Sequence, residues 1–425
     1  MQTFNTHRLE NGIVLKIMPT DKFKTITIEM FIHHNLGPDA GWLALLPQVL
    51  LQGSEKFPTM QVIGKHLDSL YGAELSKRMQ KKGERQLMNF RLELADSKHF
   101  GAQEEVWEEG LRLLAEILLR PRLAGGNFVG QYVEQEKQNL SQQIRSLIND
   151  KRLYSVKRCI EEMCRDELFR YYQYGTADGL DGITAVELTE YYRQIIAANP
   201  ISLYVIGDVD EAAVTAAAQE HFRFPRTEAA AMRPTEVVTA PARQDTIVEK
   251  EPVSQGKLVI GYRTGTSIVD DDYVTMLVYN SVLGGGGNSK LFLNVREKAS
   301  LAYYASSQLE VVKGLLFVSA GIEAGNFQQA VDIIDDQVAA IENGNVTDEE
   351  LIHSKRLLIQ SLQKTGDVPD GLINFALLDD ITGRSRSIDG ITAAIERVTV
   401  DDIVRVGSRV RKDLTYFLRN EEGSE

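Results

Sequence analysis

The chain has 425 residues, of which 43% are hydrophobic and 25% charged, a composition typical of a folded globular protein with more than one domain. Its formal net charge of −13 disfavours a phosphate-binding surface, so we expect no nucleic-acid partner. No run approaches the roughly 18 apolar residues of a membrane span, and the N-terminus lacks the basic and apolar segments of a signal peptide. We therefore expect a cytoplasmic protein without a membrane span, and the two cysteines, Cys159 and Cys164, are expected to be reduced thiols.

Strands and helices are predicted in turn along the first half of the chain. Alternation of apolar and polar residues predicts strands over 25–32, 86–94 and 202–210. Apolar residues at helical spacing predict an amphipathic helix near 105–119, and a long charged helix follows near 129–148. The segment LDSLYGAELSKRM, upstream of the second strand, is interpreted as a helix.

The second half repeats this order. Strands are predicted over 257–265 and 315–323, followed by an amphipathic helix over 327–342 that is offset by about 220 residues from its counterpart in the first half. Between the halves lies FRFPRTEAAAMRPTEVVTAPAR, which is rich in proline and has little periodicity, as a linker would. The sequence therefore predicts a duplicated α+β protein with domains at 1–223 and 247–425 and a linker at 224–246. The alternative is one large domain.

No familiar catalytic spacing stands out. None of the seven histidines lies three to five residues from another, so no helix presents the histidine pair of a zinc protease. There is no G-x-S-x-G nucleophile turn, and neither cysteine has an activating context. The sequence offers no metal site of recognisable spacing.

Two features of the second half could carry chemistry. The run GGGGNSK (284–290) departs from a phosphate loop, so a flexible connection between helices or a backbone surface for a peptide are the main interpretations. After it, residues 291–298 are predicted as a helix and a strand is predicted from about Leu301. Arg296 and Tyr303 therefore lie on successive elements, where they could stabilise a developing oxyanion or be ordinary surface and core-edge residues.

The order of these segments resembles that of the pitrilysin/insulinase-type zinc peptidases, the inverzincins. LGGGGNSKLFLNVREKASLAYYASSQLE is similar to part of their second half, FNTHRLENGIVLKIMP to their first strand pair, and NPISLYVIGDVD to the strand that closes their first domain. The resemblance covers essentially the whole chain, and it is greatest to a bacterial group of non-zinc subunits whose genes occur in pairs. It implies the fold of the mitochondrial processing peptidase, with two duplicated α+β domains, each an antiparallel sheet packed against helices.

The residues that would bind zinc are missing. Active inverzincins carry H-x-x-E-H on a helix of the first domain and a glutamate ligand on a later helix. When this motif is aligned with GWLALLPQVLLQGS, its ligand histidines fall on Ala44 and Gln48 and its general base falls on Pro47. In VEQEKQNLSQQI, Glu136 keeps one family glutamate, but the ligand position is Gln143. Alanine and amides cannot replace imidazole and carboxylate, so no zinc is expected in this chain.

Pro47 also affects the helix that carries it. Proline inside a helix removes a hydrogen bond and costs about 3 kcal/mol. We expect a kink at Pro47, or a helix that begins only near Leu46.

The resemblance assigns roles to the second-half features. In the family an arginine and a tyrosine seven residues apart reach the zinc site from the second domain, and Arg296 and Tyr303 match that pair. The glycine run is similar to the peptide-contacting loop of the non-catalytic processing subunit, which implies substrate contact by Gly284, Gly285, Gly286 and Gly287.

These expectations describe a subunit that is inactive alone. Its partner would be a zinc-bearing inverzincin relative, with a homodimer as the alternative, and zinc is expected only in that partner. Arg296 and Tyr303 would act in trans on a peptide substrate. The rival interpretation is a scaffolding homologue without a role in proteolysis, like the core subunits of a respiratory complex, and an autonomous zinc peptidase is the third.

Overall fold

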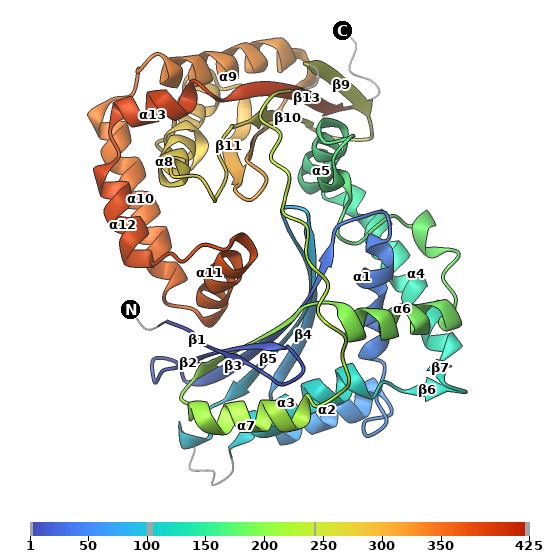
Figure 1. The fold of residues 1–425 in the computed structure, drawn as a ribbon. Helices are drawn as coiled ribbons and strands as arrows, with labels where there is room; N and C mark the ends of the chain where they lie inside the picture. The colour runs from blue at the N-terminus through green and yellow to red at the C-terminus, as the bar shows by residue number, and fades with distance from the viewer. Residues whose placement is uncertain (1–2, 100–104, 242–243, 421–425) are drawn as a thin grey trace. The chain divides into compact units, whose positions relative to one another are not determined.

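The structure is a computed structural model that describes residues 3–99, 105–241 and 244–420 (Figure 1). These residues form two compact units, each made from two parts of the chain. The first unit combines Gln2–Arg145 with Tyr171–Arg233, and the second combines Ser146–Arg170 with Pro234–Glu425. The sequence-based ranges placed all of 1–223 in one domain, whereas residues 146–170 pack with the C-terminal part of the chain.

The first unit contains a six-stranded sheet and its covering helices. Its strands are β1 (Asn5–Arg8), β2 (Val14–Pro19), β3 (Thr25–Asn35), β4 (Glu74–Lys82), β5 (Arg85–Ala95), β6 (Leu123–Ala124), β7 (Asn127–Phe128) and β8 (Ile201–Gly207). Its helices are α1 (Ala40–Leu50), α2 (Met60–Ser69), α3 (Val106–Leu119), α4 (Gly130–Ser146), α6 (Ala185–Ala198) and α7 (Glu211–His221). The short strands β6 and β7 pair only with each other.

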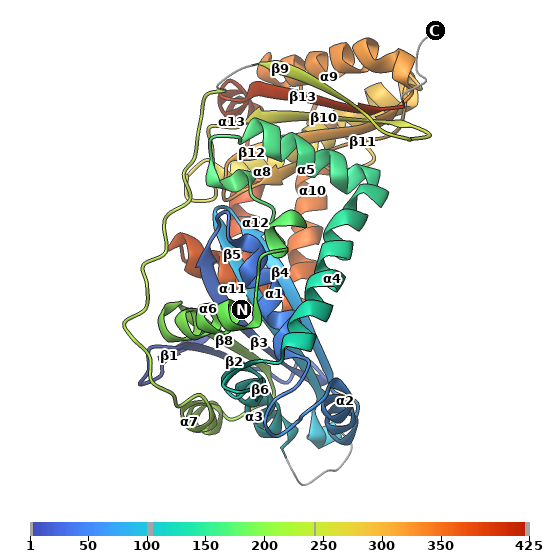
Figure 2. The same ribbon diagram turned by 90° about the vertical axis from the view of Figure 1, so that its right-hand side faces the viewer.

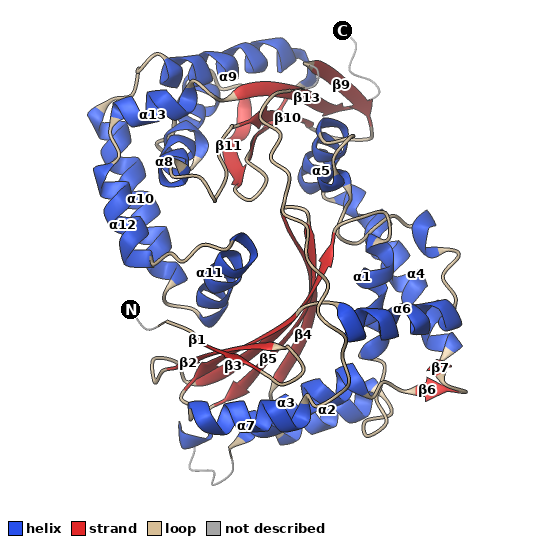
Figure 3. Cartoon of the chain, viewed as in Figure 1, coloured by secondary structure: helices blue, strands red, loops and turns tan. Residues whose placement is uncertain are grey.

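The second unit contains a five-stranded sheet (Figure 3). Its strands are β9 (Asp245–Lys250), β10 (Gly256–Arg263), β11 (Ala302–Glu310), β12 (Leu315–Ile322) and β13 (Arg411–Arg419). Its helices are α5 (Lys151–Met163), α8 (Tyr273–Gly284), α9 (Phe327–Glu342), α10 (Asp348–Thr365), α11 (Pro369–Thr382), α12 (Ile388–Arg397), α13 (Val400–Gly407) and the π-helical segment η5 (Phe292–Lys298).

Both sheets have the same strand order. The first runs β2-β8-β3-β5-β4, with β1 added beside β2, and the second runs β9-β13-β10-β12-β11. In each sheet the first of these pairs is parallel and the other three are antiparallel. This common topology confirms the predicted duplicated α+β fold, and it adds one parallel pair to the expected antiparallel sheet.

The predicted apolar faces form the two main cores. Ile26, Ile28, Met30 and Ile32 of β3 pack with the stripe of α3 in the first unit. In the second unit, Leu258, Ile260 and Tyr262 of β10 pack with α8 and α9, while Val259 points to the opposite face and packs with α5. Figure 2 shows α5 lying along that face of the second sheet.

One element was predicted wrongly. LDSLYGAELSKRM is not one helix, because α2 ends at Ser69 and β4 begins at Glu74. Tyr71 (φ 59°) and Gly72 (φ 76°) have left-handed backbone conformations that terminate the helix. The residues that follow form β4, and all of β4 pairs antiparallel with β5.

Residues 224–241 of the predicted linker contain no helix or strand, but its last residues, Asp245 and Thr246, belong to β9. The linker is attached to the second unit, because the buried Lys313 ammonium donates a hydrogen bond of 2.6 Å to the Glu236 carbonyl oxygen. Among the described helices, none has the length and apolarity needed to cross a bilayer.

Candidate functional site

Helix α1 carries the positions that would bind zinc in an active relative. It runs without interruption from Ala40 to Leu50, so the expectation of a start near Leu46 is wrong. Pro47 lies inside the helix, and Ala44 and Pro47 are both buried. Gln48 is partly buried. Helix α1 is therefore formed in spite of the proline, because its apolar residues pack into the core of the first unit.

The retained glutamate is bound by amides. Glu136 of α4 is 5% exposed, and its Oε1 accepts hydrogen bonds from Gln52 Nε2 at 2.7 Å and from Asn139 Nδ2 at 3.1 Å. Burial lowers the pKa of the nearby Lys77 ammonium, while the charge of Glu136 opposes that effect. Neutral donors and one lysine thus surround this carboxylate.

These residues do not fit a zinc ion. Ala44 has no donor atom, Gln48 and Gln143 offer only amides, and Glu136 is already hydrogen-bonded by two amide groups. Within the described ranges, no three histidine, cysteine, aspartate or glutamate side chains are grouped so that they could hold a metal ion.

Arg296 lies in η5 and is partly exposed. Its guanidinium carbon is 4.7 Å from the centroid of the Phe292 ring, and its Nε is 3.6 Å from Glu297 Oε1. The Arg296 side chain is 41% exposed and that of Glu297 is 53% exposed, so the ion pair between them is weak. The guanidinium has donors left to bind another group.

Tyr303 lies at an irregularity in β11. Ser300, with φ 54°, turns the chain out of η5, and the register between β11 and β12 shifts between Ala302 and Tyr304. Tyr303 is the extra residue at that bulge, and it is 77% exposed. In the described chain its hydroxyl has no hydrogen-bond partner, and no contact joins it to Arg296. The structure places the two residues on either side of one turn without joining them.

The glycine run is mostly explained by packing. A Cβ on Gly284 would lie 2.4 Å from the Ser307 nitrogen. A Cβ on Gly285 would lie 2.7 Å from Ser281 Cα, and a Cβ on Gly286 would lie 2.8 Å from a Leu357 methyl group. Gly287 alone of the four has open space around it. The run lets the end of α8 approach β11, the strand that carries Tyr303.

Lys290, which follows the glycines, has a structural partner. Its ammonium lies 2.9 Å and 3.0 Å from the two carboxylate oxygens of Glu350, and the side chain is 8% exposed. Glu350 also belongs to the capping box that begins α10. This lysine is therefore engaged, unlike the phosphate-binding lysine of a nucleotide loop.

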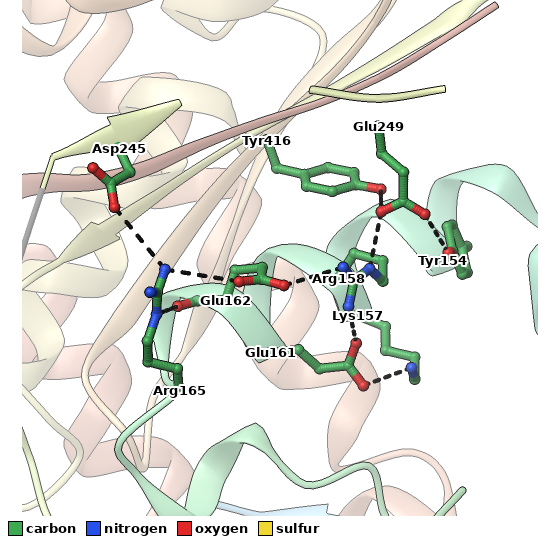
Figure 4. Close-up of polar contacts among 9 residues, drawn as sticks. All are labelled: Tyr154, Lys157, Arg158, Glu161, Glu162, Arg165, Asp245, Glu249 and Tyr416. Carbon is green, nitrogen blue, oxygen red and sulfur yellow. Dashed lines mark hydrogen bonds and ion pairs between the residues drawn. The ribbon is translucent and has the colours of Figure 1, made fainter. Parts of the chain in front are cut away.

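A polar network missed from the sequence holds α5 on the second sheet (Figure 4). Glu249 of β9 accepts hydrogen bonds from Tyr154 Oη at 2.6 Å, Tyr416 Oη at 2.8 Å and Arg158 Nε at 3.0 Å. Burial raises the pKa of Glu249, but these three donors outweigh it and hold the pKa below its ordinary value. The charged side of KRLYSVKRCIEEM indicates an exposed helix face, but nothing in that segment identifies β9 as its partner.

Comparisons with known proteins identify the family of the chain. The family profile "Peptidase M16 inactive domain" matches residues 182–358. A relative from Bacillus subtilis (strain 168), named "Probable inactive metalloprotease YmfF", is 39% identical over 414 residues, which cover 97% of each chain. This chain belongs to the M16 peptidase family. The predicted family is thereby confirmed, and this M16 protein is a homologue of an inactive metalloprotease.

Solved structures agree with the fold. A conserved protein from Enterococcus faecalis V583 matches with a TM-score of 0.91 and 25% identity over 100% of both chains. A peptidase M16 inactive domain from Pseudomonas fluorescens matches with a TM-score of 0.81 and 16% identity over 99% of both chains. The likeness extends over both units of this M16 protein.

Proposed function

We propose that this M16 protein is a non-zinc subunit of a two-chain peptidase. It pairs with a zinc-bearing relative, binds a peptide, and supplies Arg296 and Tyr303 to the partner's zinc site. Zinc belongs to the partner, since Ala44, Gln48 and Gln143 cannot hold it. The chain cleaves nothing by itself.

The exposure of Tyr303 carries this proposal. A large aromatic side chain that is 77% exposed gains little from burial, and a tyrosine hydroxyl at a surface bulge is free to bind another molecule. Packing within the second unit does not account for this tyrosine. A role toward a partner or substrate does account for it.

The chemistry needs only positioned donors. Zinc in the partner would supply an activated water, and negative charge would develop on the carbonyl oxygen of the attacked peptide bond. A guanidinium and a phenol can donate hydrogen bonds to that oxygen. Arg296 and Tyr303 offer these donors from two sides of the turn at Ser300.

The glycine run has a divided role in this proposal. Gly284, Gly285 and Gly286 let α8 pack closely against its neighbours, and Gly287 is open to contact a substrate backbone. A peptide would then meet the loop at one residue rather than along all four.

The test is peptide cleavage by a mixture of this chain and its zinc-bearing relative. The variant with Arg296→Ala and Tyr303→Phe is expected to lower kcat by at least about a hundredfold, because the loss of even one aligned oxyanion donor costs on the order of 2.7–4 kcal/mol, roughly 10²–10³-fold in kcat. Arg356→Ala with Tyr71→Phe alters an exposed arginine and an exposed tyrosine elsewhere, and should leave kcat unchanged.

Three results would contradict the proposal. If the Arg296/Tyr303 variant cleaves at the full rate, the action in trans is wrong. If the chain co-purifies with a large assembly and never alters cleavage by the zinc-bearing relative, it is a scaffold. One zinc per chain together with cleavage by the chain alone would instead indicate an autonomous peptidase.

A further inference from the structure

Tyr304 differs from its neighbour Tyr303 in being half-buried on the sheet. It pairs with Gly321 of β12, which in turn pairs with Lys257 of β10. A Cβ on Gly321 would lie 2.6 Å from Tyr304 Cε1. The glycine therefore leaves room for the Tyr304 ring to lie across β12 toward Lys257.

Two cations lie beside this ring. The guanidinium carbon of Arg152 is 4.8 Å from the ring centroid of Tyr304, and the ammonium of Lys257 is 5.7 Å from it. Arg152 also donates a long hydrogen bond of 3.4 Å to Ser306 Oγ. Lys257 donates one of 3.0 Å to Gln255 Oε1. The Tyr304 ring therefore contacts two positive charges, Arg152 from α5 and Lys257 from β10.

Neither cation is paired with a carboxylate anywhere in the described chain. This is unexpected in a protein with 60 acidic and 47 basic residues. Asp150 is near Tyr304, but its carboxylate accepts the Leu153 N–H at 3.0 Å and so caps α5. Burial, followed by the charge of Arg152, lowers the pKa of Lys257, so the two charges repel each other.

The position of Arg152 is fixed by the rest of α5. Arg158 and Tyr154 bind Glu249, as Figure 4 shows. A Cβ on Gly261 would lie 2.5 Å from the Met163 sulfur, so this end of the helix lies close against β10. Because α5 is held along its length, Arg152 in its first turn has a defined position. Less conformational entropy is therefore lost when a ligand binds to Arg152.

We propose that Arg152 and Lys257, beside the Tyr304 ring, bind a carboxylate of a peptide. The Ser306 hydroxyl, which accepts from Arg152, lies in the same cluster and can donate a further hydrogen bond. The inference deepens the proposed function, on whose peptide binding it rests, by assigning acidic or carboxyl-terminal peptide segments as the preferred ligands. The carboxylate belongs either to an acidic side chain or to the C-terminus.

Binding of short labelled peptides to the full chain, followed by fluorescence anisotropy, tests this. Four peptides of equal length are compared: neutral with an amidated C-terminus, neutral with a free C-terminus, and amidated versions with one glutamate or one lysine. One or both carboxylate peptides should bind about five- to tenfold more tightly than the neutral amidated one, as a partly screened charged hydrogen bond allows. Which of the two gains affinity identifies the source of the carboxylate.

The gain should disappear in Arg152→Gln with Lys257→Gln and persist in Tyr304→Phe to within about twofold, since the ring remains. Arg356→Gln with Arg384→Gln, which removes two exposed arginines elsewhere, is the charge-matched control and should keep the full gain. Circular dichroism and thermal melting would show that every variant is folded.

Three results would overturn the inference. Equal affinity for all four peptides would leave peptide binding in place and remove the carboxylate preference. A gain that survives the Arg152/Lys257 double variant would place the preference elsewhere. Absence of all peptide binding would also overturn it, while the cleavage assay with the zinc-bearing relative decides the proposed function independently.

Discussion

Pro47 shows how the loss of one chemical role frees a single residue. It occupies a buried place inside α1, where it cannot donate to the Leu43 carbonyl oxygen four residues earlier. By the resemblance to active inverzincins, this position would hold their general base, a role that proline cannot fill. The packing of the helix into the first core offsets the missing hydrogen bond.

Replacing this proline should therefore stabilise the protein. Pro47→Ala restores the donor to Leu43, recovers part of the roughly 3 kcal/mol cost of an interior proline, and leaves a small cavity. The free energy of unfolding, measured with urea, should rise by about 1–2 kcal/mol.

Pro369 provides the control for that measurement. It stands at the start of α11, where a missing N–H costs little. Pro369→Ala should change the free energy of unfolding by less than about 0.5 kcal/mol. A loss of stability in Pro47→Ala would show that α1 is adapted to its proline.

At the scale of single residues, the resemblance assigns the family's zinc positions to Ala44, Pro47 and Gln48 of one helix, and a spacing of seven residues selects Arg296 and Tyr303. The roles of these residues stay predictions. The Arg152–Tyr304–Lys257 cluster could not be predicted in this way. Its members lie on three elements far apart in sequence, and only the packing of α5 on the second sheet brings them together.

Among the elements, α5 depends most on a charged contact. The Glu249 carboxylate accepts hydrogen bonds from two tyrosines and Arg158 and so connects α5 to the edge strand β9. Its folded-state pKa lies below the ordinary value of 4.5. The resulting stabilisation is fully present above that ordinary value and is lost as the pH falls through the folded-state pKa.

Glu249→Gln should change this pH dependence. The variant should melt at a lower temperature than the wild type at pH 7, and the difference between the two should shrink as the solution is made more acidic than the ordinary pKa of 4.5. Thermal melting across that range is the measurement. Glu349→Gln, in the exposed first turn of α10, should follow the wild type throughout, and a constant difference for Glu249→Gln would refute the linkage.

Elements with regular periodicity were predictable, and their ends were less so. The strands at 25–32 and 86–94 were predicted from alternating apolar residues, although the structure buries both faces of β3, and the helix near 105–119 was predicted from its apolar stripe. The segment after α2 was misread as helix, because its helical composition continues past the backbone reversal at Tyr71 and Gly72. A positive φ at a tyrosine has no composition signal.

At the scale of the whole chain, the linker is tied to the second unit by a buried ionic group. The fully buried Lys313 lies 2.6 Å from Glu167 Oε2 and donates to the Glu236 carbonyl oxygen. Glu167 also binds Arg263 at 2.7 Å, and Arg263 binds Asp413 at 2.6 Å. Burial raises the pKa of Glu167, but its two basic partners hold the pKa below the ordinary value.

Removing the lysine should destabilise the protein strongly. Lys313→Met leaves buried acceptors without their donor, at a cost of about 3 kcal/mol in the free energy of unfolding. It should also make the linker cleavable at a lower protease concentration. Lys355→Met, a lysine that donates to the exposed Glu396 carbonyl, should cost less than about 0.5 kcal/mol. Equal effects of the two substitutions would show that the buried group does not hold the linker.

The packing of residues 146–170 with the second unit determines how the chain could be divided. A cut in the linker would leave α5 on the N-terminal fragment, while the sheet that α5 covers would be on the C-terminal fragment. The two fragments would therefore stay associated through α5. The two repeats of this fold are duplicated in topology, yet they are not separable genetic modules: the C-terminal half of the sequence lacks the α5 residues that its own core requires.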